Sequence, residues 1–414
     1  RPRRAGTSLS QPPSPPPSTI AALLKLLSHP TISSKHWIIR QYDHEVQGNT
    51  VLKPLVGPGG RGPGDAAIIQ PIPTSTRGIA IACGLQTGIG DPTVPGSDPY
   101  LMALAAVDEC IRNLVCVGGN PDQTAILDNF CWPSCEKPEN MGSLVRAAEG
   151  CYDAAKAYRT PFVSGKDSLN NQLRYEDPIT RERRVIEVPP TLLITGLAQV
   201  TNINRAVTMD AKAPGNSLIL LGNTEHQMGG SLYASLFGNT TEGAGVPTTD
   251  LARGPATARA VAQCITDGLV ASAHDCSEGG LLTAVAEMLI ATTGLTPGSG
   301  GETGSGSGAG NTMQGLAGLL ARGNNLPPLG AELIVSHDLL DTAQVAFAET
   351  PSRYILEVMP QDLPRLRNVL RDFGGATLAI LGTLNRTGRL VWKHGDVDVS
   401  VDDLAEAWLR PLDW

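Results

Sequence analysis

Short runs of branched apolar residues alternate with stretches of helical periodicity along the chain, and this alternation restricts the possible folds more than any other feature. The runs lie at residues 79–81, 125–128, 162–164 and 217–222, and helical spacing is found at 100–115 and 143–158. Strands that alternate with helices build sheets covered by helices. Only 4% of the residues are aromatic, whereas glycine and proline number 46 and 32. We therefore expect a loop-rich α/β (α+β) fold.

The length of 414 residues suggests two domains, with three as the alternative. Proline and glycine concentrate at residues 211–216, where we place the boundary, so that the predicted domains span residues 19–211 and 212–414. The proline-rich residues 1–18 are expected to be a disordered tail, and residues 296–311 a flexible glycine- and serine-rich insertion. The chain does not begin with methionine, which suggests that the sequence starts partway into a longer protein.

Further local patterns predict individual elements. Residues 68–69 and 79–81 indicate strands that pair, residues 37–51 are typical of a strand-rich segment, and residues 399–409 indicate an amphipathic helix.

Charge and composition exclude several classes of protein. The formal net charge of -8 argues against nucleic-acid binding, which requires basic surfaces. No apolar run approaches the ~20 residues of a membrane span, and a signal peptide is not recognisable. The chain has 8 cysteines, mostly in apolar segments, which favours reduced thiols and a cytoplasmic protein. Cys131 and Cys135 have no second matching pair, so structural thiols are favoured over zinc ligands.

Glu109 and Asn113 project from one face of the predicted helix at 100–115, where they could share a magnesium ion. The alternative is an exposed ion pair between Asp108 and Arg112, with Glu109 solvated.

A second polar group surrounds the end of two predicted strands. Asp128 closes one strand, and the loop after the other contains Gly165, Lys166, Asp167 and Ser168. Glycine lets main-chain N–H groups approach phosphate, lysine supplies charge, and aspartate can hold magnesium. A plain polar turn is the alternative.

Asp275 precedes Gly279 and Gly280 at the start of a predicted helix, whose N-terminus attracts anions. Asp275 could then be a metal ligand, although a capping turn made by Ser277 or Glu278 is an alternative. The sequence has no P-loop, and the glycines at residues 57, 59 and 62 precede a strand-like segment instead of the helix of a dinucleotide site.

Taken together, several motifs resemble one family. They are QYDHEV (41–46), GPGDAA (62–67), AVDECIRN (106–113), LDNFCWP (127–133), PFVSGKDSLNN (161–171) and HDCSEGGLLTAVAEM (274–288). The family is phosphoribosylformylglycinamidine synthase, also called formylglycinamide ribonucleotide amidotransferase, and the match is to the second half of its synthetase subunit. The resemblance implies an aminoimidazole-ribonucleotide-synthetase-like N-terminal ATP-binding domain, followed by the matching C-terminal α/β domain.

The resemblance also implies roles for single residues. Asp128 and Gly165 match ATP contacts, Ser168 a substrate contact, and Glu109, Asn113 and Asp275 match positions around nucleotide-bound magnesium. Many relatives have asparagine where this chain has Lys166. Because an ammonium group cannot bind a cation, we expect Lys166 to contact phosphate and Asp167 to serve as the substitute ligand. No catalytic residue is assigned, since the family's catalytic histidine belongs to the first half.

The implied reaction is ATP-dependent amidation of formylglycinamide ribonucleotide, through an imidophosphate intermediate that ammonia attacks, in the de novo synthesis of purines. It requires ATP, Mg²⁺, the first half of the synthetase, a glutaminase subunit that supplies ammonia and a small bridging subunit. An alternative is a non-catalytic nucleotide-binding scaffold that is inactive without the first half. A self-sufficient kinase-like homodimer is a third and disfavoured interpretation.

Overall fold

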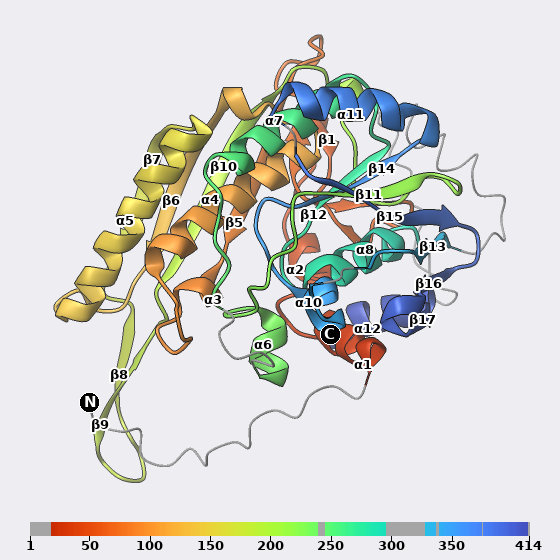
Figure 1. Ribbon diagram of the computed structural model, residues 1–414. Coiled ribbons are helices and arrows are strands. Elements are labelled where there is room, and N and C mark those ends of the chain that lie inside the picture. The colour runs from red at the N-terminus through yellow and green to blue at the C-terminus, as the bar shows by residue number, and fades with distance from the viewer. Residues whose placement is uncertain (1–17, 239–244, 295–327, 337–338, 375, 413–414) are drawn as a thin grey trace.

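The computed structural model describes residues 18–238, 245–294, 328–336, 339–374 and 376–412. The predicted insertion at 296–311 and the predicted tail, apart from Ser18, lie outside these residues. Two large sheets organise the rest of the chain (Figure 1).

The first sheet is formed by the first half of the chain. In spatial order its strands are β1 (Thr50–Leu52), β4 (Ala67–Ile69), β5 (Gly78–Leu85), β10 (Thr191–Val200), β6 (Thr124–Cys131) and β7 (Phe162–Ser168). Neighbouring strands are antiparallel except β6 and β7, which are parallel and joined through a helix. The predicted pairing of residues 68–69 with 79–81 is confirmed, since Ile69 lies opposite Ile79.

Two long helices cover one face of this sheet, α4 (Pro99–Cys116) and α5 (Pro138–Tyr158). Asp98 caps α4 by accepting a hydrogen bond from the main-chain N–H of Tyr100, and Pro99 occupies the first turn, where its missing N–H costs nothing. The opposite face of the sheet carries exposed apolar side chains, among them Ile81, Leu85 and Leu197. One face of the first sheet is therefore core and the other is surface.

The second sheet contains β12 (Ser272–Asp275), β14 (Tyr354–Val358), β11 (Ser217–Leu221), β15 (Leu378–Asn385), β13 (Gly330–Leu333), β16 (Arg389–Trp392) and β17 (Val397–Ser400). Its interior strand β11 is buried on both sides, because Leu218 and Leu220 enter one core and Ile219 and Leu221 the other. Such a strand appears in sequence as a continuous apolar run instead of an alternating one.

Helices cover both faces of the second sheet. One core contains α7 (Arg253–Thr266) and α11 (Leu363–Asp372), and the other contains α1 (Thr19–Leu27), α8 (Gly280–Ile290), α10 (Thr342–Phe347) and α12 (Val401–Leu409). The smaller elements are α2 (His36–Arg40), α3 (Thr87–Gly90), α6 (Leu232–Phe237), 3-10 helices at Val46–Gly48, Pro121–Gln123, Ile203–Arg205, Pro360–Asp362, Lys393–Gly395 and Arg410–Leu412, the pair β2 (Leu55–Val56) and β3 (Gly62–Pro63), and the projecting hairpin β8 (Gln172–Glu176) and β9 (Arg183–Glu187).

The boundary predicted near residue 212 falls between β10 and β11, which belong to different sheets. The division at that point stays a prediction, because α1 precedes it in sequence but buries Leu23 and Leu26 in the second core, beside α8 and α12. Among the described helices, none combines the length and apolar character needed to cross a membrane. All cysteines are free thiols, as predicted.

The prediction of a strand-rich segment at residues 37–51 is wrong. This segment holds the short helix α2 and a 3-10 helix, and only its last residues enter a strand. Gln47 adopts a positive φ of 63°, a conformation that ends a regular strand.

Candidate functional site

A cavity of 330 Å³ lies between α4, the end of β12, the loop that precedes α8 and the segment between α1 and α2. Its ionisable or amide-bearing lining residues are Lys35, Asp65, Cys83, Glu109, Asn113, His274, Asp275, Glu278 and Glu287. The predicted magnesium ligands Glu109, Asn113 and Asp275 thus meet in one place, although Asp275 lies far from the other two in sequence. Their common role as ligands stays a prediction.

The free edge of β5 fixes the two ligands that α4 supplies. Strand β4 pairs only with residues 79–81 of β5, so the main chain beyond that point has no strand neighbour on this side within the described part of the chain. Glu109 Oε2 accepts a hydrogen bond from Leu85 N at 2.7 Å, and Asn113 Nδ2 donates to Cys83 O at 2.9 Å. The carboxylate and the amide are therefore oriented by the sheet, and the amide oxygen of Asn113 is left for a ligand.

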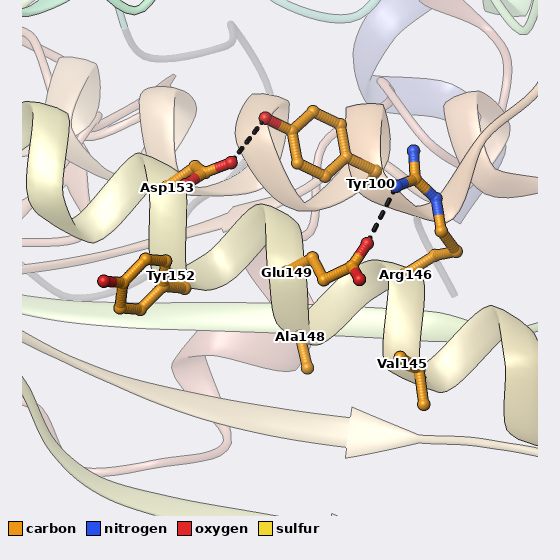
Figure 2. Close-up of a pocket in the computed structure, with 7 residues that line it drawn as sticks. All are labelled: Tyr100, Val145, Arg146, Ala148, Glu149, Tyr152 and Asp153. Atoms are coloured by element: carbon orange, nitrogen blue, oxygen red, sulfur yellow. Dashed lines mark hydrogen bonds and ion pairs between the residues drawn. The ribbon is translucent and has the colours of Figure 1, made fainter.

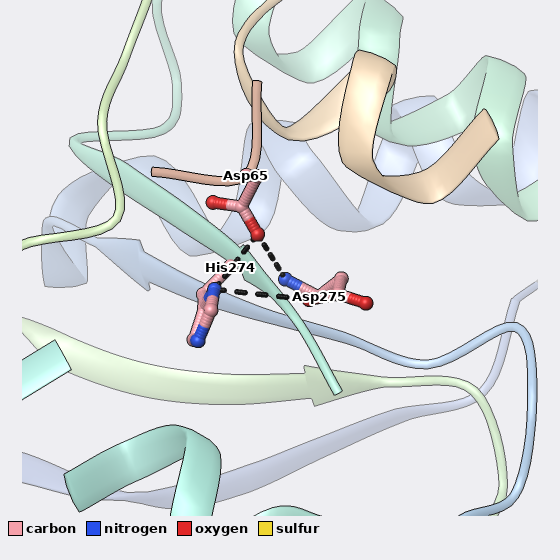
Figure 3. A group of neighbouring side chains, drawn as sticks. All are labelled: Asp65, His274 and Asp275. Atoms are coloured by element: carbon pink, nitrogen blue, oxygen red, sulfur yellow. Dashed lines mark hydrogen bonds and ion pairs between the residues drawn. The ribbon is translucent and has the colours of Figure 1, made fainter. Parts of the chain in front are cut away.

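Asp65, His274 and Asp275 lie close together in the lining of the cavity, and Figure 3 shows the three side chains. Asp65 Oδ1 lies 2.8 Å from His274 Nδ1 and accepts the main-chain N–H of Asp275 at 3.1 Å. On its other side, His274 Nε2 lies 3.2 Å from Glu287 Oε2. The second oxygen of Asp65, Oδ2, is buried and has no hydrogen-bond partner among the residues that the structure describes. A buried carboxylate oxygen without a partner is costly unless a ligand satisfies it.

The crowding of carboxylates shifts their protonation. Burial, followed by the charges of Glu278 and Asp275, raises the pKa of Glu109 well above its usual range. Burial also raises the pKa of Glu278, to about 8, and that of Asp65. Burial alone would lower the pKa of His274, but Asp65 and Glu287 outweigh it and raise that pKa well above its usual value. The cavity therefore retains protons near neutral pH that a divalent cation would displace.

The chemistry of the donors suits magnesium. Carboxylate and amide oxygens are hard ligands, which Mg²⁺ and Ca²⁺ prefer, and the unsatisfied Asp65 Oδ2 adds one more. Lys35 is the one lysine or arginine among the lining residues that the structure describes. Its Nζ donates to Thr31 O and Ser33 O at 2.7 and 2.6 Å, and burial lowers its pKa. A fixed ammonium group beside a cation site is an arrangement that suits phosphate.

The remaining predicted residues lie elsewhere on the first sheet, at the ends of β6 and β7. Asp128 lies opposite Gly165 and Asn129 opposite Lys166. Because neighbouring residues of a strand point to opposite faces, and Ile126 and Phe130 enter the core, Asp128 faces the helices. By the same alternation Gly165 and Asp167 share that face, whereas Lys166 and Ser168 occupy the other, where Lys166 Nζ lies 2.9 Å from Ser168 Oγ.

The strand register places Asp128 at the same position along the strand direction as the end of β5, where Glu109 binds. Gly84, next to the Leu85 N–H that Glu109 binds, lies opposite Ile194 on β10, and Ile194 lies opposite Asp128. Asp128 is thus two strands away from Gly84, or roughly 10 Å between main chains. The prediction of one loop that gathers glycine, lysine and aspartate around phosphate is therefore only partly reflected in the geometry, since Lys166 and Asp167 point to opposite faces of the sheet.

A wider groove of 630 Å³ on the outer surface of α4 and α5 contains none of the predicted residues (Figure 2). Its polar groups are already paired, because the Tyr100 hydroxyl donates to Asp153 and Arg146 binds Glu149. We therefore place the functional site at the carboxylate-lined cavity.

Comparison with known proteins agrees with this architecture. Residues 63–180 match the family described as "AIR synthase related protein, N-terminal domain", and residues 213–297 match its C-terminal domain. Each half of the chain thus resembles one of the two domains of this family. It is 32% identical over 410 residues to the phosphoribosylformylglycinamidine synthase subunit PurL of Synechococcus sp. (strain CC9902), a match that covers 95% of this chain and 46% of that protein. The chain thus spans about half the length of such relatives.

Solved structures of PurL from Thermotoga maritima share the fold. The structure described as PurL complexed with ATP has a TM-score of 0.56 at 16% identity and covers 94% of this chain and 52% of that one. The structure described as PurLQS has a TM-score of 0.60 at 15% identity, with 95% and 52% covered. At these identities the likeness establishes the fold alone. The predicted α/β fold of AIR-synthase type, in two matching parts, is confirmed.

Two alternative interpretations of the site are wrong. Asp108 and Arg112 do form an ion pair, but both are buried, and Glu109 is buried instead of solvated. At the start of α8, the hydroxyl of Ser277 contacts Arg112, Glu109 and Asp275, and the N–H of Gly279 donates to Glu349 at 2.7 Å. A carboxylate of the protein itself therefore occupies part of the anion site predicted at this helix.

Sequence reasoning missed Asp65, His274 and Lys35. Asp65 follows a glycine-rich stretch that was discounted as a dinucleotide loop, and the GPGDAA motif around it was the signal that could have identified it.

Proposed function

We propose that this chain is the second half of the synthetase of phosphoribosylformylglycinamidine synthase, and that its cavity holds a magnesium-bound adenine nucleotide. The similarity to PurL along 95% of the chain supports the assignment. The observation that carries the nucleotide site is the buried, unpartnered Asp65 Oδ2 in a cavity that also contains Glu109, Asn113 and Asp275. These groups match the ligand preference of magnesium.

In the proposed reaction, ATP phosphorylates the amide oxygen of formylglycinamide ribonucleotide, and ammonia then displaces phosphate to give the amidine. Magnesium would neutralise charge on the phosphates during transfer. Glu109, Asn113, Asp65 and Asp275 would hold the cation, and Lys35 would contact a phosphate oxygen. On the strands, Asp128 and Gly165 would contact ATP, Lys166 would contact phosphate, Asp167 would be a further cation ligand, and Ser168 would contact the substrate.

A second candidate function is a nucleotide-binding scaffold that does not turn over. His274 is the one histidine lining the described cavity, and it is held between Asp65 and Glu287. With both ring nitrogens engaged, it is poorly placed to transfer a proton to or from a bound molecule. The cavity is thus better equipped to bind than to catalyse, which favours a composite active site whose reactive groups come from the first half.

The proposed partners are the first half of the synthetase, a glutaminase subunit and a small bridging subunit. The open face of the first sheet supports the first of these, since it exposes Ile81, Leu85 and Leu197 on the same face that carries Lys166 and Ser168 further across the sheet. An apolar sheet face on the surface is typical of an interface. Lys166 and Ser168 would then lie within the composite site.

The test is isothermal calorimetry of Mg²⁺ with ADP and with ATP on the chain described here. We expect saturable, magnesium-dependent binding that Glu109→Gln and Asp65→Asn weaken by about 10-fold or more, because each removes a charged ligand while keeping its shape. Glu149→Gln, in the surface groove, is the matched control and should leave binding unchanged. If neither nucleotide binds, or if all three variants bind like the wild type, the cavity is not the nucleotide site.

Turnover is measured separately, as phosphate release from ATP with formylglycinamide ribonucleotide and ammonia. Binding without phosphate release supports the scaffold or half-enzyme function, whereas release by the chain alone would show a complete active site.

A further inference from the structure

We propose that the buried pair Asp108 and Arg112 is a positioning device that sets the separation between the cation ligands Glu109 and Asp275. The inference rests on the proposed cation site. It assigns a role to residues that line neither the cavity nor the strand ends.

Asp108 anchors one end of this device. Its carboxylate is buried, with 1% of the residue exposed, and it accepts hydrogen bonds from the Tyr158 hydroxyl on α5 and from Arg112 one turn along α4. It also accepts the N–H and the hydroxyl of Ser352, at 2.8 and 2.6 Å. Ser352 lies two residues before the start of β14 in the second sheet. Asp108 therefore ties the two long helices of the first sheet to the second sheet.

Arg112 connects Asp108 to the cavity. One guanidinium nitrogen, Nη1, binds Asp108, while Nη2 lies 3.3 Å from Asp275 Oδ2 and donates to Ser277 Oγ at 2.8 Å. The guanidinium is a rigid planar fork, so the position of its Asp108 end fixes the position of its other end. Asp275 lies at the end of β12, and the fork therefore sets where this ligand stands relative to α4.

Ser277 closes the connection to the second ligand. Its Oγ lies 3.0 Å from Glu109 Oε1 and 2.7 Å from Asp275 Oδ2, and either carboxylate can accept its proton. The two proposed ligands come from α4, which covers the first sheet, and from β12 of the second sheet, and they are held by one hydroxyl and one guanidinium. Groups that hold metal ligands from behind usually contribute strongly to affinity, because the ion demands a fixed ligand geometry.

Because the pair is buried, separating Asp108 from Arg112 costs free energy. The pair can therefore hold the two ligands at a fixed distance. Burial by itself would lower the pKa of Arg112, but Asp108, Asp275 and Glu109 raise it well above its usual value, so the side chain keeps its charge. Four groups converge on Asp108 and fix it in place. A lysine at position 112 would keep the charge but could not bind Asp108 and Ser277 as a rigid fork.

The experiment is a Mn²⁺ titration of the full chain, followed by electron paramagnetic resonance, together with the water proton relaxation of the bound ion. For Arg112→Lys we expect Mn²⁺ affinity to fall about 10- to 100-fold. We also expect the number of water ligands on bound Mn²⁺ to rise, because Asp275 is no longer held in position. A role limited to stability would not change the water count.

Arg146→Lys is the matched control. Arg146 pairs with Asp98 and Glu149 on the outer side of α4 and α5, away from the cavity, so affinity and water count should stay as in the wild type. If Arg112→Lys does not fold, Asp108→Asn replaces it. This variant keeps the shape of the anchor but leaves Arg112 without its anionic partner, so that Arg112 binds Asp275 more strongly and the cation is again weakened.

The experiment distinguishes failure of this inference from failure of the proposed cation site. Wild-type affinity and water count in the Arg112→Lys or Asp108→Asn chain would overturn the inference, and so would a loss of affinity in Arg146→Lys as large as that in Arg112→Lys. If the wild-type chain binds no Mn²⁺, the proposed cation site itself fails, and the inference fails with it for that separate reason.

Discussion

Glu349 shows how one half-buried carboxylate can make stability depend on pH. Its Oε1 accepts the N–H of Gly279 at the start of α8 and the N–H of Leu232 at the start of α6, at 2.7 and 3.0 Å. Burial raises its pKa from 4.5 to about 7, and the two N–H bonds reduce the shift without cancelling it. Between these values the folded state retains a proton that the unfolded state has released. The free energy of unfolding therefore falls as pH rises from about 4.5 to 7.

We predict that Glu349→Gln removes this part of the pH dependence. Both hydrogen bonds use the same oxygen, so a glutamine amide can accept them while mimicking the protonated acid. Thermal unfolding at pH 5 and pH 8 should show the wild type losing more stability than the variant, by up to roughly 3 kcal/mol. The exposed Glu406→Gln on α12 is the control and should behave as the wild type does. Identical pH profiles for wild type and Glu349→Gln would contradict the prediction.

For single residues, the sequence predicted which side chains share a helix face better than it predicted which of them are buried. Helical spacing placed Glu109 and Asn113 on one face of α4, as the structure has them. It could not show that Asp108 and Arg112 are buried, because the groups that bury them, such as Ser352 and Asp275, are far away in sequence. Burial of a charged pair depends on such long-range contacts, and an isolated helix pattern contains no information about them.

Gly165 on β7 offers a test at the scale of a strand. A methyl group added there would overlap the Asp128 carboxylate on the neighbouring strand β6. Only the end of a flexible side chain would have to move, and the backbone does not need the conformational freedom of glycine at this position. We predict that Gly165→Ala displaces Asp128 and, if Asp128 contacts ATP as proposed, weakens nucleotide binding about 10-fold in calorimetry, with a small loss of stability.

Two comparisons make this strand test specific. Gly142→Ala on the exposed side of α5, where an added methyl group meets no atom, should leave nucleotide binding unchanged. In Asp128→Ala the loss of affinity should already be complete, so adding Gly165→Ala should cost nothing further. Additive losses in the double variant would show that Gly165 acts independently of Asp128.

Elements with strong periodicity were predictable, and segments held by tertiary contacts were not. Helix α4 and the pairing of β4 with β5 follow from apolar spacing, and both are found. Residues 37–51 contain isoleucine and valine, which favoured strands, yet they form helical turns that leave Ile38 and Val46 exposed. Intrinsic β-propensity is weak and context-dependent, and no partner strand was available to realise it.

The whole molecule spans about half the length of its relatives and exposes an apolar sheet face. Sequence predicted a two-part architecture of AIR-synthase type, and the family matches and the fold confirm it. It could not predict that α1 packs in the second core, because this contact joins the start of the described chain to α12 near its end. Contacts between segments so far apart in sequence form only when the whole chain folds.

The open face of the first sheet should be the surface that binds the first half of the synthetase. We predict that Ile81→Glu and Leu197→Glu each weaken binding of a separately expressed first half of the Synechococcus relative, because each places a charge in an apolar interface. Both side chains are 36% exposed, so the melting temperature of the chain alone should change little. Binding is measured by biolayer interferometry, with the second half of that relative as competitor.

Ile179→Glu provides the control, since this residue is 89% exposed in the turn between β8 and β9, outside the sheet face. Competition by the relative's own second half establishes that the two chains use the same surface. If Ile81→Glu and Leu197→Glu bind the first half as well as Ile179→Glu does, the open sheet face is not the interface. The composite site would then have to form on another surface, and Lys166 and Ser168, which share the open face, would lose their proposed contacts with phosphate and substrate.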